Sequence, residues 1–130
     1  MGQLDRFKLD GQVALVGGGG GAIGGAMAVA LAEAGAKVAV TDISQELVDA
    51  TKAKVQAVGG ECLAVAGDMT QRDEADAVVD EVVNHLGRLD IMVNAIGGGA
   101  GKVLFEAQEY PDDAWDWIYD INVRCTLVPT

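Results

Sequence analysis

A run of glycines lies between an apolar segment and a segment with helical character, and it could hold a phosphate group. Residues 17–24 read GGGGGAIG, and Gly19, Gly21 and Gly24 match the pattern G-x-G-x-x-G. Such glycines let the backbone approach a pyrophosphate, and the helix that follows stabilises its charge. Asp42 ends the next apolar run, where a carboxylate can accept hydrogen bonds from a ribose. This spacing predicts a dinucleotide site, and the alternatives are a flexible turn and a helix-capping acid.

Four apolar runs predict the strands that would position these residues. The runs are nearly continuous rather than alternating, which is typical of parallel strands covered on both faces. Their starts lie roughly 25 residues apart, which corresponds to one strand–helix unit each. Right-handed crossovers then give the strand order 3-2-1-4. We therefore expect an α/β fold, a Rossmann-like doubly wound parallel sheet, as one domain over residues 1–130. The expected strands are Val13–Gly17, Val38–Asp42, Leu63–Gly67 and Ile91–Ile96.

Helices are predicted between the strands. The first covers residues 26–34, while Ser44 and Thr70 can cap the second and third. The fourth is expected to begin near Pro111 or Asp112. The third helix has an apolar stripe at helical spacing, made of Ala75, Val78, Val79, Val82, Val83 and Leu86. On the fourth helix we interpret the aromatic side chains of Trp115, Trp117 and Tyr119 as packing residues.

The composition disfavours several classes of partner and site. A net charge of -11 argues against nucleic acid, because phosphate binding relies on clustered Lys and Arg. Residues 11–32 carry no charge and are long enough to cross a bilayer at about 20 residues, but five consecutive glycines would break such a helix. Cys62 and Cys125 lack metal-ligand spacing, which predicts buried free thiols, a cytoplasmic location and no metal site.

A second register of the glycine run resembles the turn T-G-x-x-x-G-x-G of the short-chain dehydrogenase/reductase family. Three further segments follow in the family's order, and together with the glycine run they span nearly the whole chain. Residues 67–70 read GDMT and residues 89–97 read LDIMVNAIG, which is similar to D-x-L-V-N-N-A-G. Residues 115–122 match W-D-x-x-x-x-x-N. The chain departs from the family at Gly17, Ala22, Ala95 and Ile96, where the family has Thr, Gly, Asn and Ala.

The resemblance implies an NAD-dependent oxidoreductase that acts on an alcohol or carbonyl substrate and assembles as a homo-oligomer. It places Asp68 near the adenine and makes Asn122 a member of a catalytic tetrad. The loop 97–101 would lie beside the nicotinamide or the substrate, and the alternative is a mobile surface loop. The residues implied to bind the cofactor are Gly18, Gly21, Ile23, Gly24, Asp42, Asp68, Met69, Asn94 and Gly97.

The surroundings of Asp42 favour NAD over NADP. A 2′-phosphate needs a basic partner, and none follows Gly24 or stands in residues 43–46. A carboxylate at position 42 would repel that phosphate and accept hydrogen bonds from ribose hydroxyls instead. We therefore expect NAD as the cofactor.

The residues that carry proton transfer in this family do not occur in the 130-residue sequence. Ser44 is the only serine, and Tyr110 and Tyr119 are followed four positions later by alanine and valine, so there is no Y-x-x-x-K. We expect the chain to be inactive by itself and to be the N-terminal part of a longer dehydrogenase or a truncated product. Two alternatives stay open, a catalytically inactive dinucleotide-binding module and a Rossmann-like methyltransferase. The Asn94–Gly97 segment and Asn122 favour a dehydrogenase over the methyltransferase.

Overall fold

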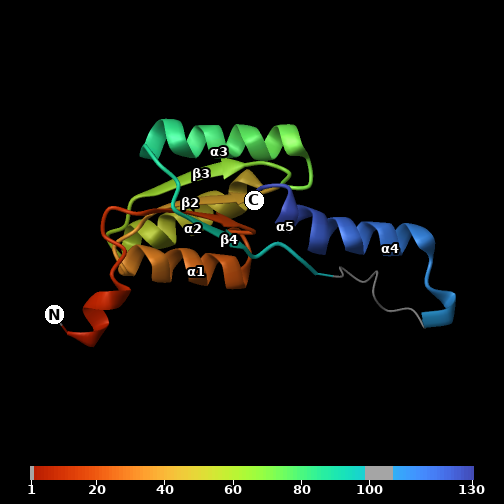
Figure 1. The fold of residues 1–130 in the computed structure, drawn as a ribbon, viewed down its shortest axis with the longest axis horizontal. Helices are drawn as coiled ribbons and strands as arrows, with labels where there is room; N and C mark the ends of the chain where they lie inside the picture. Colours follow the sequence, from red (N-terminus) through yellow and green to blue (C-terminus); the bar gives the residue numbers. More distant parts are fainter. Residues whose placement is uncertain (1, 99–106) are drawn as a thin grey trace.

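The computed structural model describes residues 2–98 and 107–130 (Figure 1). The described residues form one sheet of four parallel strands in the order β3-β2-β1-β4, which confirms the predicted topology. Gly17 pairs with Thr41 on one side and with Asn94 on the other, so the carboxyl ends of three strands meet at one edge. The strands are β1 (Val13–Gly17), β2 (Lys37–Asp42), β3 (Cys62–Ala66) and β4 (Ile91–Asn94).

Helices cover both faces of this sheet. In Figure 1, α3 lies on one face, and α1 and α2 lie on the other. The α-helices are α1 (Ala22–Glu33), α2 (Gln45–Ala57), α3 (Arg72–Leu86), α4 (Asp112–Tyr119) and α5 (Cys125–Leu127). Short 3₁₀ segments cover Gln3–Phe7 and Ala107–Glu109, and a π-helical turn at Asp120–Arg124 joins α4 to α5. No helix within the described ranges is long and apolar enough to cross a membrane.

Two apolar clusters hold the layers together. Leu15 and Ala39 point toward α3 and pack with Met69, while Val16 and Val40 point toward α1 and α2. Successive strand residues alternate between these clusters because side chains alternate across a strand. All five residues of β1 are buried, as expected for a strand covered on both faces.

Several predicted boundaries were wrong, including those of β3, which covers Cys62–Ala66 rather than Leu63–Gly67. Helix α1 begins at Ala22 rather than residue 26, because Gly21 takes an extended conformation and serves as its N-cap. Thr70 does not cap α3, whose N-cap is Gln71. Strand β4 ends at Asn94, although the N–H of Ala95 still donates to the carbonyl of Gly17 at 2.9 Å.

The other predicted helix features agree with the structure. Ser44 caps α2 by accepting a hydrogen bond from the N–H of Leu47 at 3.4 Å. Helix α4 begins at Asp112 with Pro111 as its N-cap. Residues 112–127, here called the α4–α5 arm, extend past the carboxyl ends of the strands (Figure 1).

Candidate functional site

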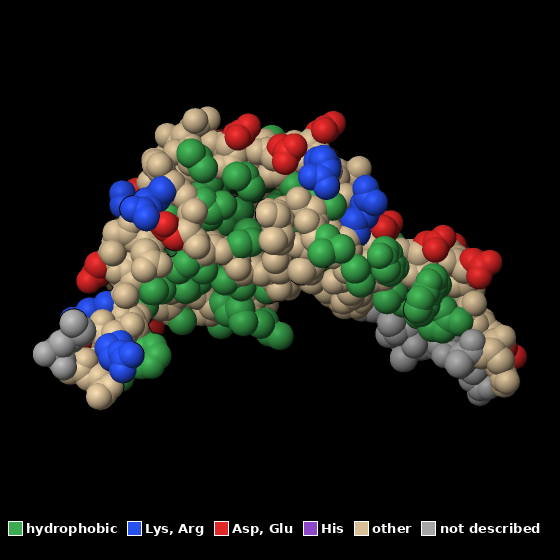
Figure 2. All heavy atoms as spheres, in the orientation of Figure 1, with side chains coloured by type: hydrophobic (Ala, Val, Ile, Leu, Met, Phe, Trp, Pro, Cys, Tyr) green, Lys and Arg blue, Asp and Glu red, His purple; other side chains and the backbone are tan. Residues whose placement is uncertain are grey.

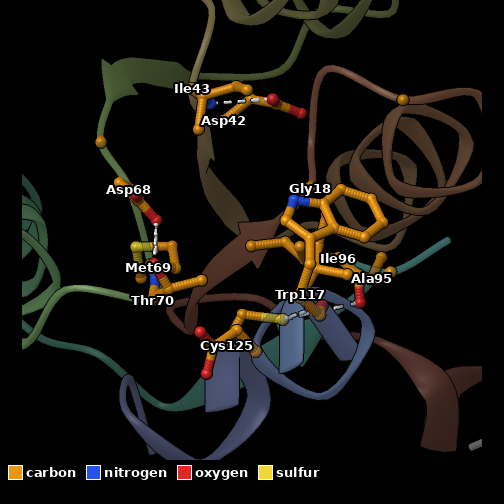
Figure 3. A pocket seen from close by; sticks show the side chains of 15 residues that line it. Gly18, Asp42, Ile43, Asp68, Met69, Thr70, Ala95, Ile96, Trp117 and Cys125 are labelled. Carbon is orange, nitrogen blue, oxygen red and sulfur yellow. Dashed lines mark hydrogen bonds between the residues drawn. The ribbon is translucent and has the colours of Figure 1, made fainter. Parts of the chain in front are cut away.

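A cavity of about 500 Å³ lies at the carboxyl ends of β1, β2 and β3 (Figure 3). Its walls come from the turn after β1, the end of β2, the segment after β3, the segment after β4 and one side of the α4–α5 arm. This volume lies within the range of small-molecule sites. Six predicted site residues line it together, namely Gly18, Gly21, Asp42, Asp68, Met69 and Gly97.

The turn after β1 needs glycine for steric reasons. Gly18 has a φ of 74°, and a Cβ there would lie 2.7 Å from the backbone of Ala95. A Cβ on Gly24 would collide with the carbonyl of Gly18. These two positions are the ones that the family-like register requires. Ala22, the departure between them, lies inside α1, where φ is negative and a side chain is tolerated.

A buried hydroxyl from α2 supports the same turn. The Oγ1 atom of Thr51 donates to the carbonyl of Gly19 at 2.8 Å, and Thr51 is 2 % exposed. Sequence reasoning missed this residue. Its only local signal is a place on the buried face of α2, between Val48 and Val55.

Asp42 is oriented toward the glycine turn. Its Oδ2 atom accepts a hydrogen bond from the N–H of Gly20 at 3.2 Å, and its Oδ1 atom accepts one from the N–H of Ile43 at 2.8 Å. The capping of α2 belongs to Ser44, so the helix-capping alternative for Asp42 is wrong. The carboxylate therefore stands at the cavity wall with its remaining lone pairs available to a ligand.

The segment after β3 is folded tightly around Asp68. Its Oδ1 atom accepts from the N–H and the hydroxyl of Thr70 at 2.9 Å and 2.6 Å. The N–H of Asp68 donates to the Oε2 atom of Glu74 at 2.7 Å. This engagement with Asp68 is why Thr70 is not the N-cap of α3. The side chain of Met69 is buried in the core, which leaves its backbone as the part that a ligand could meet.

The other predicted site residues do not line the cavity. Ile23 is 70 % exposed in the first turn of α1, and Gly24 is buried beneath the glycine turn. Asn94, at the end of β4, donates to the hydroxyl of Thr130 at 3.5 Å. Of the predicted loop 97–101, only Gly97 and Gly98 lie within the described residues.

Asn122 holds the peptide groups of Gly98. Its Nδ2 atom donates to the carbonyl of Gly98 at 2.9 Å, and its Oδ1 atom accepts from the N–H of Gly98 at 3.1 Å. The same Nδ2 atom donates to the carbonyl of Ile118 at 2.9 Å. A Cβ on Gly97 would lie 2.7 Å from Asn122 Oδ1, so a side chain there would have to displace the Asn122 amide. The side chain thus ties the π-helical turn to the segment after β4.

The α4–α5 arm contributes a wall that the sequence did not indicate. Four of its residues line the cavity, namely Trp117, Asp120, Ile121 and Cys125. The interpretation of Trp117 as a packing residue alone is therefore too narrow. The spacing of four between positions 117, 121 and 125 marks one helix face, and this was the available signal.

Cys125 fixes the position of that wall. It is fully buried, and its thiol donates to the carbonyl of Ile121 at 2.5 Å. Burial is the largest influence on the thiol and raises its pKa. Cys62, the other free thiol in the described part of the chain, is also buried, and burial raises its pKa to about 11. Both observations confirm the prediction of buried free thiols.

The charge around the cavity is negative. Asp42, Asp68 and Asp120 line it, and none of the described residues in its walls is Lys or Arg. Carboxylates accept hydrogen bonds from hydroxyl and amino groups. Phosphate groups would instead depend on backbone N–H groups at the glycine turn and on the N-terminus of α1.

Known proteins are similar to this chain in sequence and in fold. The profile of the short chain dehydrogenase family matches residues 12–130. The 7alpha-hydroxysteroid dehydrogenase of Escherichia coli strain K12 is 38% identical over 119 residues, which cover 92% of this chain and 45% of that protein. The chain thus spans about half the length of the curated relatives it matches.

Two solved structures illustrate the likeness. A 7 alpha-hydroxysteroid dehydrogenase complexed with NADH and 7-oxo glycochenodeoxycholic acid has a TM-score of 0.85 and 34% identity, over 96% of this chain and 48% of its own. An NAD+-bound xylitol dehydrogenase has a TM-score of 0.89 and 33% identity, over 94% of this chain and 46% of its own.

Proposed function

Since this chain belongs to the short-chain dehydrogenase family, we propose that it carries the dinucleotide-binding part of an NAD-dependent oxidoreductase that acts on an alcohol or carbonyl group. The observation that carries the proposal is the cavity in which Asp42 faces the glycine turn at the carboxyl ends of parallel strands. In open α/β sheets this edge is where nucleotides bind. Two similar structures, one complexed with NADH and one bound to NAD+, support the choice of cofactor.

Each wall of the cavity would hold one part of the dinucleotide. Gly18, Gly21 and the N-terminus of α1 would meet the pyrophosphate, since their backbone can approach it without a side chain in the way. The carboxylate of Asp42 would accept hydrogen bonds from the ribose hydroxyls. Asp68 and the backbone of Met69 would meet the adenine. Ile23 and Gly24 would contribute through the first turn of α1.

The residues after β4 would serve the nicotinamide end. Asn94 and Gly97 lie there, and Asn122 holds the segment through Gly98. NAD, when bound, supplies the hydride acceptor of the reaction. We assign Asn122 the family's catalytic position, and the hydrogen bonds it makes here would orient the loop that borders the nicotinamide.

A titration tests this function directly. We expect calorimetry with the 130-residue chain to detect binding of NAD, weaker binding of NADP and no binding of S-adenosylmethionine. The difference between the first two ligands follows from the repulsion between Asp42 and a 2′-phosphate. Binding of S-adenosylmethionine without NAD would favour the methyltransferase alternative, and binding of none of the three would contradict the proposal.

The substrate, assembly and location of the protein are also proposals. A small-molecule alcohol or carbonyl compound fits the family, whose relatives include a hydroxysteroid dehydrogenase. Neither nucleic acid nor a membrane is proposed as a partner. We propose a homo-oligomer because the α4–α5 arm exposes apolar side chains, and a cytoplasmic location because two buried free thiols suit a reducing compartment.

A further inference from the structure

One aromatic side chain enters the cavity from a direction that no motif indicated. Figure 3 shows the indole of Trp117 projecting from α4 toward Gly18, beside Ile96. Trp117 is half-buried, whereas Trp115, two positions earlier, is 64 % exposed. The helix therefore places its two tryptophans differently, with only Trp117 at the cavity wall.

The position of the indole is held from two sides of the cavity. Asn122 ties the arm to Gly98, after β4. Arg124 donates from Nε to the carbonyl of Thr70, after β3, at 3.1 Å. These contacts hold the π-helical turn Asp120–Arg124, and α4, which bears Trp117, runs directly into that turn.

The surroundings of the indole suit a nucleoside. It shares the cavity with Asp42 and Asp68, whose carboxylates can accept hydrogen bonds from hydroxyl and amino groups. A flat apolar ring beside such acceptors matches a ligand that combines a planar base with a ribose. Aromatic side chains stack on nucleobases because every base has a π-face.

We propose that Trp117 is a nucleotide-contacting residue, whose indole packs against the adenosine part of the dinucleotide. The inference rests on the proposed function, because it assigns a role within the same cavity. It commits to the adenosine part, because Asp42 and Asp68, which are proposed to meet the ribose and the adenine, line the same cavity as Trp117. The nicotinamide part is thus expected to leave Trp117 unaffected.

Fluorescence can separate the two tryptophans, which are the only two in the chain. Trp115→Phe leaves Trp117 as the single reporter, and Trp117→Phe leaves Trp115. We expect AMP to quench the emission of the Trp115→Phe variant at saturation and to leave the Trp117→Phe variant nearly unchanged. Nicotinamide mononucleotide should have little effect on either variant. Quenching by nicotinamide mononucleotide alone would overturn the assignment to adenosine.

Affinity provides a second readout. We expect Trp117→Ala to weaken AMP binding by at least about fivefold in calorimetry, the lower end of the effect of removing an aromatic ring stacked on a base. Trp117→Phe should lose less, because it keeps a ring. Trp115→Ala is the matched control and should bind AMP within about twofold of the unmodified chain, because Trp115 does not line the cavity. Circular dichroism confirms that each variant is folded.

The outcomes distinguish this inference from the proposed function. If AMP and NAD bind, Asp42→Ala weakens both, and Trp117→Ala weakens neither, the role of Trp117 is wrong while the cofactor site stands. If the unmodified chain binds neither AMP nor NAD, the proposed function itself fails. A loss of AMP affinity in Trp117→Ala with quenching confined to Trp117 supports both.

Discussion

Asp42 is the residue that we propose to govern the choice of cofactor. Its carboxylate lies beside the glycine turn, accepts the N–H of Gly20 at 3.2 Å, and has no basic side chain among the described residues of the cavity wall. An acid at this position would discriminate between NAD and NADP by its charge as well as by hydrogen bonding. We expect this carboxylate to accept hydrogen bonds from ribose hydroxyls and to repel an additional phosphate.

We predict that Asp42→Ala weakens NAD binding by about 1–3 kcal/mol, the scale of hydrogen bonds to a charged group. The variant should also discriminate less against NADP, because the repulsion is gone. Calorimetric titration of both cofactors measures the two effects. Asp49→Ala, which removes an exposed acid from α2, is the control and should leave both affinities unchanged. Equal affinities in Asp42→Ala and the unmodified chain would show that the ribose role is wrong.

At the scale of elements, α2 supports the glycine turn through a single buried hydroxyl. Thr51 reaches across from α2 to the carbonyl of Gly19, and this carbonyl has to be satisfied because the region is buried. The family's turn begins with a threonine, and this chain has Gly17 there. In this chain a hydroxyl from a neighbouring helix supports the turn.

We predict that Thr51→Val lowers the free energy of unfolding by about 1–3 kcal/mol, because the Gly19 carbonyl loses its buried donor. The substitution keeps the volume and changes only the hydroxyl. Thr51→Ser is the matched control and should retain most of the stability, since it keeps the donor. Urea melts followed by circular dichroism give both values. A Thr51→Val variant as stable as Thr51→Ser would rule out this contribution.

A second link joins the starts of two neighbouring strands. Asp90, immediately before β4, accepts a hydrogen bond from the N–H of Val13, the first residue of β1, at 2.9 Å. Arg88 forms a bidentate pair with the same carboxylate. The hydrogen bond from Arg88 is the largest influence, followed by that from Val13, and together they hold the pKa of Asp90 below its ordinary value of 3.8.

The lowered pKa predicts a pH-dependent contribution to stability. The folded state favours the ionised carboxylate, so its contribution is present above the ordinary pKa and is lost as the pH falls through the lower pKa of the folded state. The unmodified chain should therefore have a larger free energy of unfolding than the Asp90→Asn variant near neutral pH. The difference between the two should become smaller in acid. Urea melts at a series of pH values measure it. The pKa of Asp5 is also lowered, but Asp5 is present in the unmodified chain and in the variant, so its contribution cancels from the difference in stability. A stability difference that does not change with pH would contradict a contribution from ionised Asp90.

For the whole molecule, the α4–α5 arm and the edge strand β4 leave apolar surface open. Figure 2 shows apolar side chains along the arm. Those that are exposed recur every fourth residue, namely Trp115, Tyr119, Val123 and Leu127. Strand β4 is an outer strand of the sheet formed by the described residues, and an open edge can pair with another chain.

We predict that the chain self-associates at micromolar concentration, as measured by light scattering. Trp115→Lys should lower the apparent mass, because it replaces a largely exposed aromatic side chain of this apolar surface with a charge. Val83→Lys on α3 replaces another exposed apolar residue and serves as the control, which should associate as before. A monomeric chain with a cooperative melt would show that the four strands close their own core.

We also predict that the 130-residue chain has no dehydrogenase activity through a Tyr/Lys mechanism, because its sequence lacks a Y-x-x-x-K segment. Purified protein with NAD and a panel of alcohols, or with NADH and carbonyl compounds, should show no turnover above background. Absorbance of the reduced nicotinamide follows the reaction. Turnover that disappears in Tyr110→Phe or Tyr119→Phe would contradict this prediction.

Local sequence patterns were sufficient to predict the order of the strands in the sheet and several of the residues that line the cavity. Nearly continuous apolar runs mark strands buried on both faces, and the strand order follows from right-handed crossovers in a dinucleotide-binding, doubly wound sheet. Since parallel strands end at the same edge, the glycine turn and Asp42 had to be neighbours wherever the helices settled. These features depend on spacing along the chain, which the sequence displays directly.

Contacts between distant elements required the folded chain. The spacing of 117, 121 and 125 shows that these residues share a helix face, but not that this face covers the strand ends. Likewise, the buried stripe of α2 does not reveal that Thr51 meets Gly19, 32 positions away. Thr70 was predicted to cap α3 from its position in the sequence. In the structure its hydroxyl donates to the carboxylate of Asp68 instead. Periodicity specifies the face that an element buries, whereas the partner of that face depends on how all the layers pack at once.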